Sequence, residues 1–200
     1  MRVTIFDYGA GNIHSLTKAI ESFGATVVVE PDPVRALDTD VLVLPGVGAF
    51  GLAAERLAPG RDAMRDALQQ GLPCVGICLG MQLLFDESDE SAPHSRGLGV
   101  VSGRVTRLHA RRVPQIGWNA LDDVEDAVLE RTPLSYAYYA NSYVCRPNDQ
   151  SVVRAWSTHE DDRFPAVVRV GETVGVQFHP EKSSAPGLRF LHACLQGAVQ

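Results

Sequence analysis

A cysteine lies between two glycines in the segment Gly-Ile-Cys-Leu-Gly at residues 76–80, directly after an apolar run. A nucleophile at a sharp strand-to-helix turn needs such small neighbours, because the backbone there is strained and close to other segments. A helix beginning at Leu79 would favour the thiolate of Cys78 and offer N–H groups to an oxyanion. The spacing alone leaves a second interpretation open, in which Cys78 is a small buried thiol of the core.

His179 is the histidine best placed to act as a base for such a cysteine. It follows an apolar run and precedes Pro180, which disfavours helix and keeps the segment extended. Glu181 comes two residues later, and residues i and i+2 of an extended segment point to the same side. A carboxylate there can orient the imidazole and stabilise its charged form, as the third member of a triad. On this segment alone, a surface pair at the end of a strand remains an equal alternative.

The remaining composition narrows the class of protein. The chain has 200 residues and a formal net charge of −6, which argues against a general nucleic-acid binder. Its first residues predict a strand rather than a signal peptide, and no apolar stretch is long enough to span a bilayer. No second histidine or cysteine stands at ligand spacing near His179, so we expect no metal site. Three other cysteines show no CxxC pair, which favours a cytoplasmic protein with reduced, structural thiols: Cys74, Cys145 and Cys194.

The elements that must position these residues alternate between strand and helix in the first part of the chain. Four apolar, β-rich runs are predicted to be buried strands, at residues 3–6, 26–29, 41–44 and 73–77. Helices are predicted at residues 13–23, in a stretch to about residue 70 that is interrupted at 59–60, and at 79–85. This alternation predicts an α/β fold with a central, mostly parallel sheet and helices on both faces.

The pattern changes after residue 85. Residues 86–97 are acidic and polar and predict an exposed loop, whereas residues 100–178 carry short strand signals that suggest an antiparallel extension of the sheet. Residues 186–195 predict a closing helix. Because neither a repeat nor a linker interrupts the chain, we expect one domain over residues 1–200.

Two glycine-rich loops follow predicted strands. In Pro-Gly-Val-Gly-Ala-Phe-Gly at residues 45–51, Gly46 and Gly48 tolerate positive φ, so the peptide of Val47 between them could turn over. Residues 8–12 follow a strand and open a helix, as nucleotide-binding loops do. They lack the third glycine of the dinucleotide motif and a Walker lysine, so a structural turn beside the first loop is favoured.

Residues 76–82 and 177–181 together resemble the class I glutamine amidotransferases, whose triad is a cysteine followed by His-x-Glu. Four further segments, residues 6–12, 45–50, 114–119 and 175–183, resemble the glutaminase subunits of imidazole glycerol phosphate synthases. The resemblance covers nearly the whole chain, although Asn141 stands where many members carry histidine. It implies a flavodoxin-like class I glutamine amidotransferase fold.

The resemblance also implies a mechanism. Cys78 attacks the side-chain amide of glutamine and forms a glutamyl thioester, His179 moves the proton, and Glu181 holds His179. The oxyanion is expected to bind the N–H groups of Val47 and Leu79. Other residues are expected to contact glutamine: Gly46, Gln82, Ser142 and Tyr143.

Finally, the resemblance implies a partner and no cofactor. The partner is a cyclase subunit, a (β/α)₈ barrel, which uses the ammonia to form imidazole glycerol phosphate and an aminoimidazole carboxamide ribonucleotide in histidine biosynthesis. The two subunits are expected to form a heterodimer. Its docking face is expected to include Gln115, Trp118, Asn119, Tyr138 and Lys182. A glutaminase that serves another synthase, and a degenerate member acting as a binding module, are the alternatives.

Overall fold

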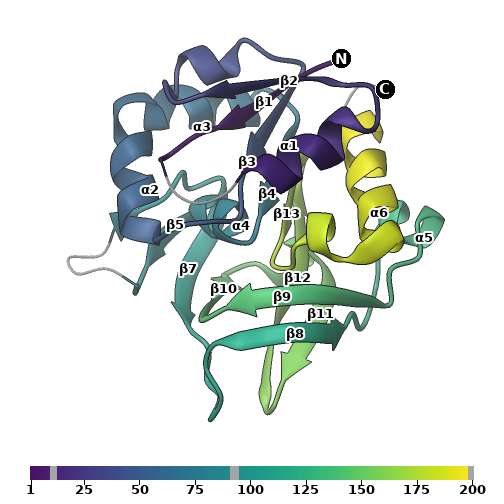
Figure 1. Ribbon diagram of the computed structural model, residues 1–200. Helices are drawn as coiled ribbons and strands as arrows, with labels where there is room; N and C mark the ends of the chain where they lie inside the picture. Colours follow the sequence, from purple (N-terminus) through teal and green to yellow (C-terminus); the bar gives the residue numbers. More distant parts are fainter. Residues whose placement is uncertain (10–12, 91–94, 198–200) are drawn as a thin grey trace.

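The structure is a computed structural model that describes residues 1–9, 13–90 and 95–197. A seven-stranded sheet with the order β11-β12-β13-β4-β3-β1-β2 runs through the molecule (Figure 1). From β13 to β2 neighbouring strands are parallel, and β12 and β11 extend this sheet in antiparallel fashion. The parallel sheet and its antiparallel extension were both predicted from the sequence.

The strands of the central sheet are β1 (Arg2–Phe6), β2 (Thr26–Glu30), β3 (Val41–Leu44), β4 (Cys74–Ile77), β11 (Val153–His159), β12 (Asp162–Val170) and β13 (Thr173–Val176). The helices are α1 (His14–Glu21), α2 (Phe50–Leu57), α3 (Arg61–Gln69), α4 (Leu79–Leu83), α5 (Ala127–Arg131) and α6 (Ser184–Gly197). Short 3₁₀ helices are η1 (Arg35–Leu37), η2 (Ala58–Gly60), η3 (Gln150–Val152) and η4 (Pro180–Lys182).

Helices cover both faces of this sheet because its central strands are apolar on both sides. In β3, Val41 and Val43 belong to the hydrophobic cluster that includes residues of α1, α5 and α6. The alternate residues Leu42 and Leu44 belong to the cluster that includes residues of α2, α3 and α4. Successive residues of a strand point to opposite faces, so a continuous apolar run needs cover on both.

Two smaller sheets lie beside the central one. The first has the order β10-β7-β5-β6 and consists of β5 (Phe85–Ser88), β6 (Ser95–Arg96), β7 (Val101–Arg107) and β10 (Tyr143–Pro147). The second is a ribbon of β8 (Gln115–Ala120) and β9 (Tyr136–Asn141). The prediction that all strand signals after residue 100 extend the central sheet was therefore only partly right. Within the described ranges, no helix has the length and apolar character needed to cross a bilayer.

The sequence prediction of an exposed loop at residues 86–97 was wrong in part. Residues 85–88 form β5, which pairs with β6 and β7, and Ser88 is fully buried. The strand was missed because its composition is acidic. It is stabilised by pairing with neighbouring strands, and its side chains do not follow a typical strand pattern. Three smaller differences are that α4 ends at Leu83, that α2 already begins at Phe50, and that α5 was not predicted. Of the glycine-rich segment at residues 8–12, residues 10–12 lie outside the described residues.

Candidate active site

Cys78 follows β4 directly and precedes the first residue of α4. Its backbone has φ 48° and ψ −103°, in the left-handed region that is strained for a residue with a side chain. A Cβ on Gly80 would lie 2.0 Å from the main-chain oxygen of Leu44, and one on Gly76 would lie 2.8 Å from that of Gly80. Both glycines are therefore required by close backbone contacts, as the cysteine-centred pattern predicted.

His179 reaches the cysteine because β13 is the parallel neighbour of β4. Val176 pairs with Ile77, and the N–H of Cys78 donates to the oxygen of Val176 at 2.7 Å. The segments that follow the two strands therefore begin side by side. The N–H of His179 in turn donates to the oxygen of Tyr138 in β9 at 2.8 Å, which fixes this segment against the ribbon.

The His179 imidazole is 2% exposed and lies between an acid and the thiol. Its Nδ1 is 2.8 Å from Oε1 of Glu181, as the proposed pairing required, although residues 180–182 form the 3₁₀ helix η4 and not the extended segment that was predicted. Burial alone lowers the pKa of His179, but hydrogen bonds with Cys78 and Glu181 and their negative charges outweigh it and raise that pKa to about 9. The imidazole is therefore positively charged at neutral pH, when it can donate a proton.

A cavity of about 340 Å³ opens over Cys78 and His179. A Cβ on Gly46 would lie 2.8 Å from Cε1 of His179, so only glycine lets the loop after β3 pass the imidazole. Gly48 has φ 115°, a conformation that favours glycine. The cavity brings together residues from five segments: Gly46, Val47, Gly48, Cys78, Leu79, Gln82, Glu90, Ala140, Asn141, Ser142, Tyr143, His179 and Lys182.

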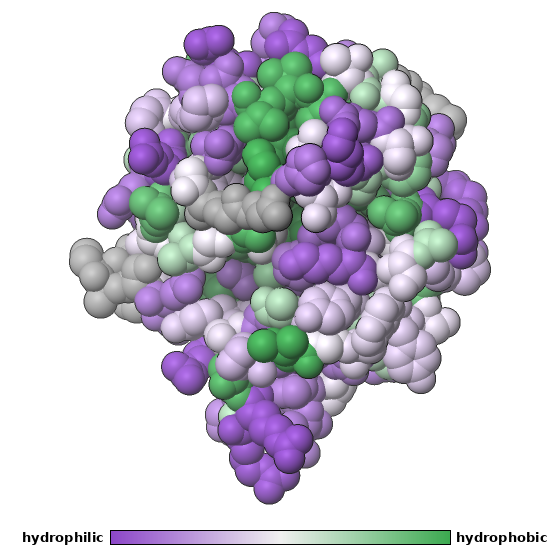
Figure 2. All heavy atoms as spheres, viewed as in Figure 1, coloured by the Kyte–Doolittle hydropathy of each residue, from purple (hydrophilic) through white to green (hydrophobic). Residues whose placement is uncertain are grey.

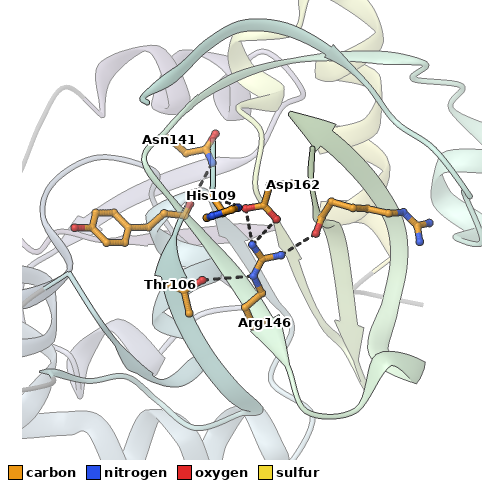
Figure 3. Close-up of polar contacts among 7 residues, drawn as sticks. Thr106, His109, Asn141, Arg146 and Asp162 are labelled. Atoms are coloured by element: carbon orange, nitrogen blue, oxygen red, sulfur yellow. Dashed lines mark hydrogen bonds and ion pairs between the residues drawn. The ribbon is translucent and has the colours of Figure 1, made fainter. Parts of the chain in front are cut away.

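Tyr143 forms part of the far wall of this cavity, and two side-chain amides donate hydrogen bonds to its main-chain oxygen. Gln82 is 5% exposed, and its Nε2 donates to the oxygen of Tyr143 at 3.0 Å. The Nδ2 of Asn141 donates to the same oxygen at 3.1 Å (Figure 3). Asn141 therefore keeps a donor at the position where histidine was expected from the resemblance, while its buried Oδ1 has no hydrogen-bond partner among the described residues.

Arg146 lies in β10, as Tyr143 does, and connects this strand to the central sheet. Its Nη2 donates to both carboxylate oxygens of Asp162 in β12 at 2.6 Å (Figure 3). Asp162 also accepts the N–H of His109 at 2.7 Å, and the Nη1 of Arg146 donates to the oxygen of Arg163 at 2.7 Å. The wall that carries Tyr143 is thereby fixed to the sheet that carries the segment of His179.

Two residues of the cavity region were not found from the sequence. Gln177 is fully buried, and its Nε2 lies 3.5 Å from the Sγ of Cys78. Its spacing of two from His179 in an extended segment was an available signal. Glu90 lines the cavity, and its Oε2 accepts the N–H of Phe50 at the start of α2 at 2.8 Å. No signal marked Glu90, because it belongs to the acidic stretch interpreted as a loop.

Of the residues expected on a docking face, some are exposed in the structure and others are buried. Trp118 is 54% exposed, and its ring lies 6.3 Å from that of Tyr138 in an edge-on contact. Asn119 is partly buried and donates to the oxygen of Thr158, and Lys182 is exposed at the cavity. Gln115 is a correction: it points to the inner face of the ribbon and is 4% exposed, so it is not available to a docking partner.

The fold and this arrangement can now be compared with known proteins. The family model of the class-I glutamine amidotransferases matches residues 4–195. A solved glutamine amidotransferase superposes with a TM-score of 0.75 at 22% identity, covering 98% of each chain. The structure of PurLQS from Thermotoga maritima superposes with a TM-score of 0.69 at 20% identity over the same shares. The chain belongs to the class-I glutamine amidotransferase family.

More similar relatives give its place within that family. The imidazole glycerol phosphate synthase subunit HisH of Halobacterium salinarum is 44% identical, over 94% of this chain and 90% of the relative. The HisH subunit of Pyrococcus furiosus is 40% identical, over 95% and 96%. These relatives place the chain among the HisH proteins.

Proposed function

We propose that this chain is the glutaminase subunit of an imidazole glycerol phosphate synthase, and that it hydrolyses glutamine to glutamate and ammonia. The observation that carries the proposal is the contact of His179 with both Cys78 and Glu181 at the floor of one cavity. A nucleophile, a base and a group that orients the base are the parts that acyl transfer through a thioester requires. The similarity to HisH subunits over 94% and 95% of the chain supports the same function.

The reaction begins when the sulfur of Cys78 attacks the side-chain carbonyl carbon of glutamine. The tetrahedral intermediate collapses, the C–N bond breaks, and the leaving ammonia takes a proton from His179. Water then attacks the thioester while His179 accepts its proton, and the C–S bond breaks to release glutamate. The raised pKa of His179 suits the first step, because the imidazolium holds the proton that the leaving ammonia needs.

The oxyanion is proposed to bind two main-chain N–H groups, those of Leu79 and Val47. Leu79 is the first residue of α4, where the N–H groups have no partner within the helix. Val47 lies between two glycines on the cavity wall, so its peptide can rotate toward the oxyanion. One such donor is typically worth about 3 kcal/mol of transition-state stabilisation, so this rotation would switch the activity.

The other end of glutamine is proposed to lie against the far wall. Gln82, Ser142 and Tyr143 border the cavity there and supply polar groups, and Gly46 leaves space beside the imidazole. The carboxylate of Glu90 lines the same cavity and can attract the α-ammonium group of the substrate. Together these groups would place the amide of glutamine next to Cys78.

The ammonia is proposed to pass to a cyclase subunit that docks as a heterodimer on the outer face of the β8–β9 ribbon. Trp118 pairs with Tyr138 on that face, and Ile116 pairs with Ala140, which lines the cavity. Ile116 is 67% exposed and Trp118 54%. Figure 2 shows a hydrophobic, green group exposed in the lower part of the molecule among white and pale purple residues. Exposed aromatic and aliphatic side chains that adjoin a cavity are typical of an interaction surface. Lys182 is exposed at the cavity, so we propose that it lies at the edge of the docking face. Asn119 lies on the inner face of the ribbon and is not included in the proposed docking face.

Two further expectations remain proposals. We propose that residues 1–200 act as one domain, which the match of one family model to residues 4–195 supports. We also propose that the protein works in the cytoplasm without a cofactor. Free, buried thiols at four positions are consistent with a reducing compartment: Cys74, Cys78, Cys145 and Cys194.

The test is glutamate release from glutamine, measured for the chain alone and with the cyclase subunit and its nucleotide ligand. We expect little turnover alone, strong turnover in the complex, and none with Cys78→Ala. A Cys78→Ala complex that turned over at the normal rate would show that another group is the nucleophile. Equal turnover with and without the partner would leave the three residues in place but exclude gating by the partner.

A further inference from the structure

Tyr8 is a buried polar side chain that the reaction above does not use. It follows β1, which lies beside β3 in the central sheet (Figure 1), and it is 1% exposed. Its ring packs edge-on against Phe6 with centroids 5.9 Å apart. Its hydroxyl donates a hydrogen bond to the main-chain oxygen of Pro45, the first residue of the loop after β3. A phenylalanine would fill the same space, so the hydroxyl is the feature to explain.

The loop that Tyr8 contacts is the one that carries Val47, and it is anchored at both ends. At its beginning, the oxygen of Pro45 accepts the hydroxyl of Tyr8. At its end, the N–H of Phe50 donates to the carboxylate of Glu90 at 2.8 Å. Between these anchors, Val47 and its two glycine neighbours border the cavity. Rotation is therefore confined to the central peptides of the loop.

The environment keeps the tyrosine a donor. Burial, and then the negative charges of Cys78 and Asp7, raise the pKa of Tyr8 well above its ordinary value. The hydroxyl consequently holds its proton over the whole range in which the enzyme would work. The carbonyl of Pro45 can only accept, so this hydrogen bond has one direction.

We propose that Tyr8 is a positioning residue of the oxyanion hole: it fixes the Pro45 carbonyl, so that the N–H of Val47 can be aimed at the oxyanion. The proposal rests on the proposed glutaminase function. Tyr8 does not touch the substrate and acts only through the loop. Because Val47 is proposed to donate to the transition state rather than to bound glutamine, losing the anchor should affect kcat and leave KM nearly unchanged.

The experiment compares Tyr8→Phe with wild type in the complex with the cyclase subunit and its nucleotide ligand. We expect kcat for glutamate release to fall about tenfold, the upper range for one neutral hydrogen bond, with KM for glutamine changed less than about twofold. Tyr8→His, which keeps a donor on a ring, should recover part of the lost kcat.

Tyr139→Phe is the matched control. Tyr139 is also a fully buried tyrosine, and its hydroxyl lies 2.5 Å from Oγ of Ser157, away from the loop. This variant should lower the melting temperature to a similar extent as Tyr8→Phe while leaving kcat and KM at wild-type values. An equal loss of kcat in both variants would mean general loosening of the core and would overturn the proposal.

Other outcomes are equally decisive. An unchanged kcat in Tyr8→Phe, or a rise in KM at constant kcat, would rule out a role in the oxyanion hole. Failure of Tyr8→Phe to form the complex would make the contact structural, which also overturns the proposal. A wild-type complex that releases no glutamate would instead refute the proposed function, so the two failures can be told apart.

Discussion

His179 is the residue whose protonation links the chemistry of the site to the stability of the protein. Its imidazole has an ordinary pKa near 6.5 when unfolded, and its contacts with Cys78 and Glu181 raise it to about 9 when folded. A raised pKa means that the folded state binds the proton more tightly, so protonation of His179 stabilises the fold.

This difference predicts a dependence of stability on pH. The contribution of His179 should be fully present below about pH 6.5 and should be lost as the pH rises through about 9, which amounts to about 3 kcal/mol. The measurement is urea unfolding at a series of pH values, for wild type and for His179→Gln. The variant should lack this part of the slope, and identical slopes in the two proteins would contradict the assignment.

At this scale, the sequence indicated the reactive residues better than their surroundings. That Cys78, His179 and Glu181 lie together could be predicted from local sequence patterns, although residues 180–182 form η4 and not the expected extended segment. Gln115 was wrongly expected at the surface because its face of the ribbon depends on pairing with Asn141, which is distant in the chain. Glu90 was missed for a related reason, since its partner Phe50 is also distant in sequence.

Among the elements, the connection between β10 and β12 through Arg146 and Asp162 is the one most open to a stability test. Asp162 is buried with its side chain 8% exposed, while the side chain of Arg146 is 32% exposed. The carboxylate also accepts the N–H of His109, so it satisfies groups from two other segments. Its removal would leave these donors without a partner in a poorly solvated position.

We therefore predict that Asp162→Ala lowers the free energy of unfolding by about 2 kcal/mol, as expected for a partly buried ion pair that loses one member. Glu87→Ala is the control, because Glu87 pairs with Arg104 between β5 and β7 with both side chains more than a third exposed. That variant should cost less than about 1 kcal/mol. Equal losses in chemical denaturation would show that the burial of Asp162 does not matter.

The elements themselves could be predicted where composition and pairing agree. The runs at β1, β3 and β4 are apolar on both faces, so sequence alone indicates that helices must cover them. β5 is acidic and gains its stability from pairing with β7. No local sequence pattern indicates this pairing. It could likewise not be predicted that β7 and β10 form a sheet separate from the central one, because a local strand pattern does not indicate which strand it pairs with.

For the whole molecule, the exposed face of the β8–β9 ribbon predicts how the subunit associates. Trp118 in β8 projects from this face next to Tyr138 in β9, and Ala140, also in β9, borders the cavity. A large aromatic side chain near the centre of an interface commonly contributes about 2 kcal/mol or more to binding.

Trp118→Glu should accordingly weaken binding of the cyclase subunit at least about thirtyfold, while the melting temperature of the free subunit stays close to that of wild type. Leu52→Glu is the matched control, since Leu52 is an exposed apolar residue, 44% accessible, on α2. Titration calorimetry measures both affinities. If the two variants bound the partner as tightly as wild type, the docking face would lie elsewhere.

The insertion of β13 between β4 and β12 also bears on the order in which the protein becomes active. During synthesis the ribosome releases Cys78 long before His179, and the strand that leads to His179 is the last of the central sheet to emerge. A nascent or partly folded chain therefore carries a thiol with no base beside it. Glutamine cannot be consumed until this strand is in place, so the arrangement of the sheet delays hydrolysis until β13 has been made and paired.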